Sequence, residues 1–144
     1  MRSRDSINAP EALVLTMVLV SAADGGMTDR EIGIMSGLVQ TLPAFQDFTR
    51  DALASVTERA ANLLHEDEGL AHASRLMRAA LSPKLRETAY ALACEVVAGG
   101  EGARRQSLEM LDFVRGELEL DPLVSAAIER GVRARYQRVD PGES

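Results

Sequence analysis

Three acidic side chains lie close together in the segment SAADGGMTDREI, residues 21–32. Asp24 comes directly before a Gly-Gly pair, and Asp29 and Glu31 follow that pair. Carboxylate and backbone carbonyl oxygens are the ligands that Ca²⁺ and Mg²⁺ take in proteins. The segment therefore predicts either a site for a divalent cation or a tight turn between two helices in which the acids act as caps.

Capping accounts for two of the three acids. Thr28 and Glu31 have the spacing of a capping box, in which each side chain accepts a hydrogen bond from the other residue's backbone amide. Asp29 is favourable in the first turn of the same helix, beside the positive end of the helix dipole. Asp24 is expected at the C-terminal end of the preceding helix, where a bound cation would offset an unfavourable charge. The spacing of the acids is not that of an EF-hand loop.

The chain also contains a weak internal repeat, which predicts two related halves. EALVLTMVLVSAADGG at 11–26 aligns with ETAYALACEVVAGGEG at 87–102, an offset of 87 minus 11, or 76, residues. The second corner keeps the glycines and lacks the acids. The residues that align with Asp24, Asp29 and Glu31 are Gly100, Arg105 and Ser107.

The other candidate residues point to structural roles. Cys94 is the only cysteine and lies among apolar residues, so we expect it to be buried and not nucleophilic. His65 and His72 are separated by a polar break and are expected at the surface. Four arginines lie near the C-terminal end of the last helix, where their positive charges interact favourably with the negative end of the helix dipole: Arg130, Arg133, Arg135 and Arg138. The alternative is that they bind an acidic partner or the acidic half of a second copy. We recognise no catalytic combination and predict no enzyme.

Composition narrows the class of protein further. The net charge is −6, and residues 1–72 carry all of it, with 11 acidic and 5 basic residues against 11 of each in 73–144. An acidic balance argues against nucleic-acid binding. With one cysteine, no disulfide can form within the chain, which favours the cytoplasm over export. The apolar run before the first corner is too short for a membrane span, which needs about 20 residues.

The elements that position these residues are expected to be helices, because the apolar residues recur every three or four positions and few residues are aromatic. We predict one all-α domain of about seven helices at 10–137, between a flexible N-terminus at 1–9 and a disordered tail at 138–144. Ser82 and Asp121, each followed by proline, are expected N-caps. The predicted helices cover 10–23, 28–41, 45–66, 70–81, 83–98, 103–118 and a last one from Pro122. The buried stripe of the sixth is predicted to be Leu108, Leu111 and Val114.

Four segments carry a resemblance to a known family: LVSAADGGMTDREI, the LPAF that follows it, LRETAYALACEVVA and AAIERGVRARY. Over most of residues 10–136 the chain resembles the TerB-like family, small helical proteins associated with bacterial tellurite resistance. The resemblance implies a metal-binding acidic patch, in which Asp24 and Glu31 match the first motif and Glu95 matches an acid before the second corner. Gly100 and Ser107 stand where the family has Asp and Glu, so at most half of a symmetric site is implied.

Two functions remain open. The first is a non-enzymatic accessory protein in a stress or tellurite/metal-resistance complex, with a divalent cation as the one predicted cofactor and with Asp24, Asp29, Glu31 and Glu95 as its candidate ligands. The alternative is a metal-independent adaptor that recruits another protein through its helix surfaces. Predicted partners are other proteins of a resistance system or a second copy of the chain.

Overall fold

The computed structural model describes residues 6–23, 25–100, 105–140 and 142. Within those residues the chain is helical and has no strand, which confirms the predicted all-α class. The helices are α1 (Ala9–Ala22), α2 (Asp29–Thr41), a 3₁₀ turn η1 (Pro43–Phe45), α3 (Arg50–Leu64), α4 (Gly69–Ala80), α5 (Pro83–Gly99), α6 (Arg105–Glu117) and α7 (Pro122–Arg135).

Side-chain caps set where several helices begin. The predicted capping box of α2 is present, since Glu31 N donates to Thr28 Oγ1 at 3.2 Å and Thr28 N donates to Glu31 Oε1 at 2.9 Å. Ser82 caps α5 and Asp121 caps α7, also as predicted. Asn8 forms a second capping box, with Glu11, at the start of α1. Each cap satisfies backbone amides that the first turn of a helix leaves unpaired.

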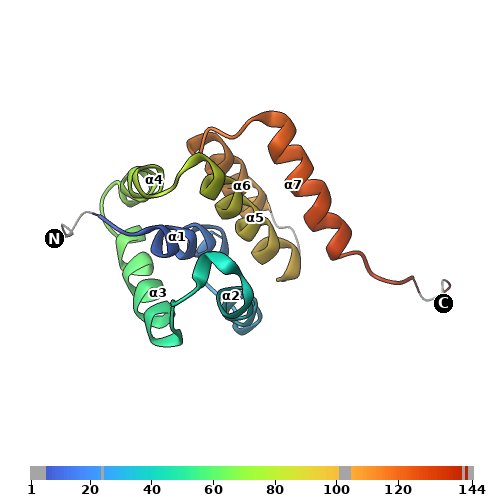
Figure 1. Cartoon of the computed structure of the whole chain (residues 1–144), viewed down its shortest axis with the longest axis horizontal. Helices are drawn as coiled ribbons and strands as arrows, with labels where there is room; N and C mark the ends of the chain where they lie inside the picture. Colours follow the sequence, from blue (N-terminus) through green and yellow to red (C-terminus); the bar gives the residue numbers. More distant parts are fainter. Residues whose placement is uncertain (1–5, 24, 101–104, 141, 143–144) are drawn as a thin grey trace.

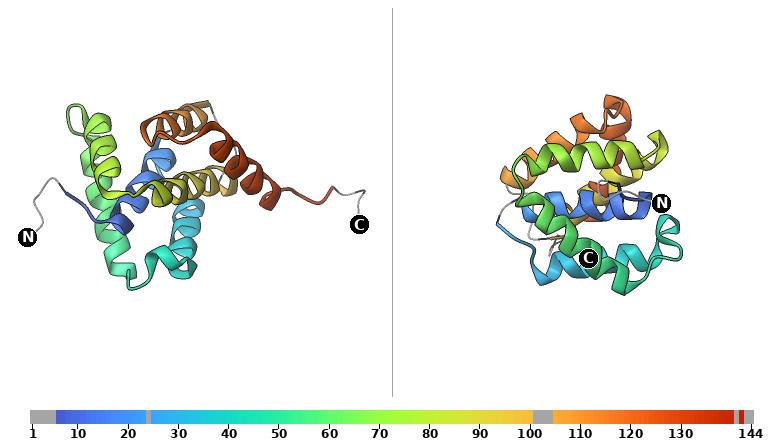
Figure 2. Two further views of the ribbon diagram at one scale, coloured as in Figure 1. Left: turned by 45° about the horizontal axis from the view of Figure 1, so that its top comes forward. Right: turned by 90° about the vertical axis from the view of Figure 1, so that its left-hand side faces the viewer.

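Helix α1 lies at the centre of the molecule (Figure 1). Every residue from Ala12 to Val20 is at most 3% exposed, because the helix is apolar on all sides and other helices surround it. It packs most extensively against α5 and α3, and it also contacts α4, α6 and α2. Figure 2 shows these helices around it from two further directions.

The outer helices are arranged around α1 and α5. Helix α3 packs mainly on α1 and α7 mainly on α5, whereas α2 packs more on α5 than on α1 and α6 packs on both. Figure 1 shows α3 and α7 at opposite ends of the molecule. Helix α2 ends at Thr41 and α6 ends at Glu117, so these ends differ by 76, the offset at which the two halves of the sequence align.

Two local predictions were wrong. The helix predicted from 45 starts only at Arg50, because Phe45 belongs to η1 and Asp47 has a left-handed backbone with φ of 71° that ends the turn before Thr49 caps α3. Leu108 was predicted to be buried in the stripe of the sixth helix, yet it is 50% exposed.

None of the helices in the described residues is long and apolar enough to cross a membrane.

Candidate functional site

The predicted ligands of the acidic corner have different surroundings. Asp24 lies outside the described residues. Asp29 is exposed in the first turn of α2. Glu31 is only 8% exposed, and its Oε1 accepts hydrogen bonds from the backbone amide and the hydroxyl of Thr28, at 2.9 and 3.0 Å. One oxygen of Glu31 therefore serves the capping box.

Glu31 also packs against the C-terminal end of α5. A Cβ atom at Gly100 would lie 3.1 Å from Glu31 Cγ and 3.0 Å from the carbonyl oxygen of Val96. Such distances are tighter than most real Cβ contacts, so glycine gives this carboxylate room to approach the end of the helix. The glycine that aligns with Asp24 in the repeat thus has a packing role of its own.

Glu95, the fourth predicted ligand, joins α5 to the end of α7. It is 8% exposed, and its two oxygens accept hydrogen bonds from Arg135 Nε at 2.5 Å and from the Tyr136 hydroxyl at 2.6 Å. Burial and the hydrogen bond to Glu95 raise the pKa of Tyr136, so the hydroxyl remains a donor. No pattern in the sequence had indicated this pairing, which connects residues 40 and 41 positions apart.

The described residues alone do not form a cation site. Glu31 and Glu95 approach the same end of α5, since Glu31 lies against Gly100 and the Tyr136 hydroxyl that binds Glu95 lies beside Gly99. Each carboxylate is already engaged, however, by a cap or by an arginine and a tyrosine. Within the part of the chain that the structure describes, no three His, Cys, Asp or Glu side chains are placed to hold a metal ion. The cation site depends on Asp24 and stays a prediction.

A larger feature, which the sequence did not predict, is an apolar groove between α2 and α3 with a volume of about 1060 Å³. Its floor is the end of α1, with Val18 and Ala22. Ile32 and Met35 line the α2 side, while the α3 side runs from Arg50 to His65. Ile32 is 44% exposed at the rim, so this apolar side chain faces the groove.

A second, smaller groove of about 400 Å³ lies between α6 and α7 above α5. Eight of its lining residues are 76 positions after residues that line the first groove. The pairs are Val18 and Cys94, Ala22 and Ala98, Ile32 and Leu108, Met35 and Leu111, Ser36 and Asp112, Leu53 and Glu129, Thr57 and Arg133, and Ala61 and Gln137. The two grooves therefore occupy equivalent positions on α1–α3 and α5–α7.

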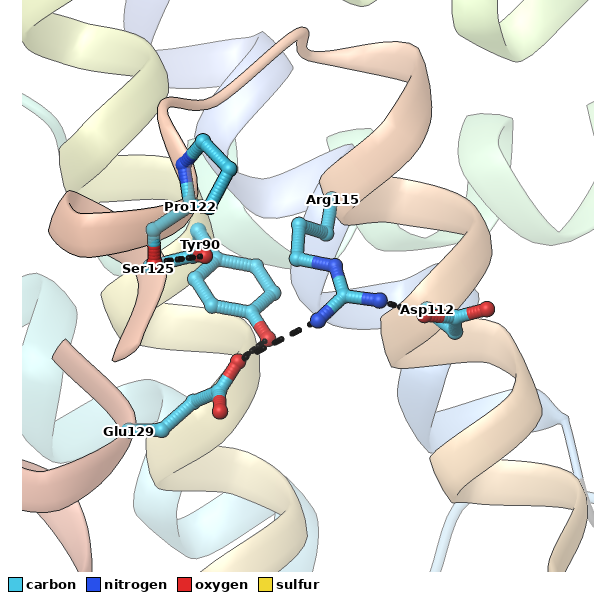
Figure 3. A network of polar contacts seen from close by, with 6 residues as sticks. All are labelled: Tyr90, Asp112, Arg115, Pro122, Ser125 and Glu129. Atoms are coloured by element: carbon cyan, nitrogen blue, oxygen red, sulfur yellow. Dashed lines mark hydrogen bonds and ion pairs between the residues drawn. The ribbon is translucent and has the colours of Figure 1, made fainter. Parts of the chain in front are cut away.

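Acidic and basic side chains of the second groove pair with one another, and Figure 3 shows Arg115 between Asp112 and Glu129. The hydroxyl of Tyr90 donates to Glu129 Oε2 at 2.5 Å, and Arg115 Nη1 lies 3.9 Å from the same oxygen. Arg115 also pairs with Asp112 one helical turn away. Burial, followed by the hydrogen bond to Glu129, raises the pKa of Tyr90, which keeps the phenol protonated. At the position of Glu129 the first groove has Leu53, so it lacks this network.

Cys94 lines the floor of the second groove but is only 6% exposed, which confirms the expected burial. Burial raises the pKa of its thiol to about 11. A thiol of this kind is protonated at neutral pH, and the thiolate is the nucleophilic form. The geometry gives Cys94 the role of a small packed side chain.

A comparison of the chain with protein-family models, with curated proteins and with solved structures gives no match.

Proposed function

We propose that this protein is a non-catalytic helical adaptor, and that the groove between α2 and α3 binds the apolar face of an amphipathic helix from a partner protein. The observation that carries the proposal is the groove itself, an apolar trough with a helical floor and two helical walls. Amphipathic helices bind such grooves through apolar side chains at positions i, i+3, i+4 and i+7.

The dimensions of the groove favour a helix over a small molecule. Its α3 wall is a helix of 15 residues, or about 22 Å at 1.5 Å per residue, which matches about four turns of a second helix. Its volume of about 1060 Å³ slightly exceeds the range for small-molecule pockets, about 300–1,000 Å³. Met27 and Met35 also line it, and methionine side chains adapt to partners of different shape.

The resemblance to TerB-like proteins supplies the biological setting of the proposal. Proteins of that family are associated with tellurite-resistance systems, so the partner helix would belong to a protein of a stress or metal-resistance complex. A similarity of family carries fold more reliably than function, and the groove is therefore the feature to test first.

The test selects binders from a library of helical peptides and maps them on the protein by NMR chemical shifts. We expect the selected sequences to share apolar residues at helical spacing and to shift residues of α2 and α3. Ile32→Glu should abolish binding, because it places a charge at the rim of the apolar trough. The matched control is Leu108→Glu, which changes the equivalent and similarly exposed position of the second groove and should leave binding unchanged. Binders that shift other surfaces, or that tolerate Ile32→Glu, would refute the proposal.

Cation binding at the acidic corner is the second candidate function. One observation favours it: Ser21 is fully buried, and its hydroxyl has no hydrogen-bond partner among the described residues. Ser21 comes three residues before Asp24 in the sequence, near the end of α1, so a polar ligand at the corner has an unsatisfied group nearby. Calorimetric titration of wild type and Asp24→Ala with Ca²⁺, Mg²⁺, Mn²⁺ and Zn²⁺ tests it, and an absence of heat with the wild type rules it out.

A further inference from the structure

We infer that the partner helix is basic outside its apolar face, an inference that rests on the function proposed for the groove between α2 and α3. The interior of that groove is apolar, so its charges lie mainly around the rim. Charges at the rim of an interface set which partners approach and how fast, more than they set the final affinity. The sign of the charge at the rim therefore predicts that the partner helix carries the opposite charge.

Exposed acidic residues lie on both helices that form the groove, and one of them, Glu58, is among its lining residues. On α3, Glu58 lines the groove, and Asp51 comes seven residues before it on the same face of the helix. On α2, Asp29 comes three residues before Ile32, again on the face that lines the groove. All three carboxylates are on exposed residues and form no ion pair with a described residue. The exposed acids at 66–68 follow directly after the α3 wall.

Few basic residues offset these acids. From Gly25 to Glu68 the sequence has eight acidic and three basic residues. Arg59 is directed toward the start of α1, where it lies 3.6 Å from Glu11. Arg50 is the one arginine or lysine among the described residues that line the groove, and it lies at the first turn of α3. The surroundings of the groove therefore remain acidic.

The second groove provides an internal comparison. There the wall positions carry Glu129 and Arg133, and Glu129 is neutralised by Arg115 and hydrogen bonded to Tyr90. Charges that are paired within the wall attract a charged helix weakly. A basic helix should therefore distinguish the first groove from the second, although the two occupy equivalent positions.

Three synthetic helices test the sign of the charge. Each has about 15 residues and the same leucine and methionine face, and the polar positions are filled with lysine, glutamine or glutamate. Fluorescence anisotropy with the full chain should show the lysine peptide binding about tenfold more tightly than the glutamine peptide, and the glutamate peptide more weakly than both. The advantage of lysine should shrink as the salt concentration rises, since exposed charges are screened within about 10 Å at 0.1 M.

Charge variants then locate the effect. The double variant Asp51→Asn, Glu58→Gln should remove most of the advantage of the lysine peptide and leave the glutamine peptide unaffected. The control Glu87→Gln, Asp140→Asn makes the same change of net charge at exposed residues of α5 and the chain end, and it should change neither affinity.

The outcomes separate the two proposals. If lysine and glutamine peptides bind equally and Ile32→Glu abolishes both, the groove binds helices and the inference about charge is wrong. If no peptide binds, or Ile32→Glu changes nothing, the proposed function itself is wrong. If the control double variant lowers lysine-peptide affinity as much as the rim variant does, overall net charge and not the rim is responsible, which also overturns the inference.

Discussion

Tyr136 donates a hydrogen bond to Glu95 over a distance of 2.6 Å, and the two residues lie 41 positions apart in the chain. The bond connects the residue just after α7 to the buried side of α5, and Arg135 donates to the other oxygen of the same carboxylate. Because α7 packs mainly on α5, this carboxylate holds the C-terminal end of the last helix in place.

Loss of the Tyr136 hydroxyl should therefore be costly. Tyr136→Phe leaves one oxygen of a nearly buried carboxylate without its donor, and we expect the free energy of unfolding to fall by about 1–2 kcal/mol. Arg135→Gln should cost less than Tyr136→Phe, because the arginine side chain is 64% exposed and solvent screens its charge. Urea denaturation measures both variants. A larger loss for Arg135→Gln than for Tyr136→Phe would contradict this assignment.

Two glycine substitutions should have opposite effects on stability. A Cβ atom at Gly69 would lie 2.3 Å from the backbone carbonyl oxygen of Leu63, so Gly69→Ala must displace the chain between α3 and α4 and should destabilise the protein. At Gly37, within α2, a Cβ atom meets nothing within 4 Å, and Gly37→Ala should stabilise by about 0.5–1 kcal/mol through helix propensity. Thermal unfolding followed by circular dichroism tests the pair, and a shift of both melting temperatures in one direction would contradict it.

Stability should decline in alkaline solution because of two groups under α7. The folded chain raises the pKa of Cys94 from 9.0 to about 11, and it raises that of Tyr90 above its ordinary value of 10.0. Since the folded state holds both protons more tightly, the Cys94 contribution is complete below about pH 9 and is lost as the pH rises through about 11, whereas the Tyr90 contribution begins to decline only above about pH 10. Urea denaturation at a series of pH values should show a shallower decline for Cys94→Ala between those limits and for Tyr90→Phe above pH 10. Slopes that equal the wild-type slope would refute the assignment.

Arg86 should resist replacement by lysine. Its guanidinium donates to the backbone carbonyl oxygens of Leu81, Arg78 and Leu118, at 3.2, 3.0 and 3.5 Å, and so joins the ends of α4 and α6 to α5. Lysine keeps the charge but lacks the planar fork that reaches several carbonyls at once. We expect Arg86→Lys to cost about 1–2 kcal/mol in chemical denaturation. The exposed Arg75 of α4 is the control, and Arg75→Lys should change stability little.

The sequence predicted best what is determined by neighbouring residues. The capping box of Thr28 and Glu31 and the caps at Ser82 and Asp121 need only three or four consecutive residues, and all are present. The burial of α1 was predictable because its residues are apolar on every side.

Features that depend on the spacing between helices were not predictable. Leu108 has the spacing of a core residue in α6, but it is half exposed because it lines a groove beside α7. Glu95 was assigned as a candidate ligand by resemblance, and its pairing with Tyr136 depends on where α7 crosses α5. The groove between α2 and α3 arises because α3 packs on α1 while α2 packs mainly on α5, an arrangement that no local pattern of residues encodes.

The central position of α1 also affects how the protein folds during its synthesis. During synthesis α1 leaves the ribosome before α5 and α6, which cover part of it. Until they emerge, a nascent chain presents an almost uninterrupted row of leucine, valine and methionine to the solvent, the kind of surface on which chains aggregate. Stable folding therefore waits for distant segments to meet, and chaperones have most to protect while the first half alone is outside the ribosome.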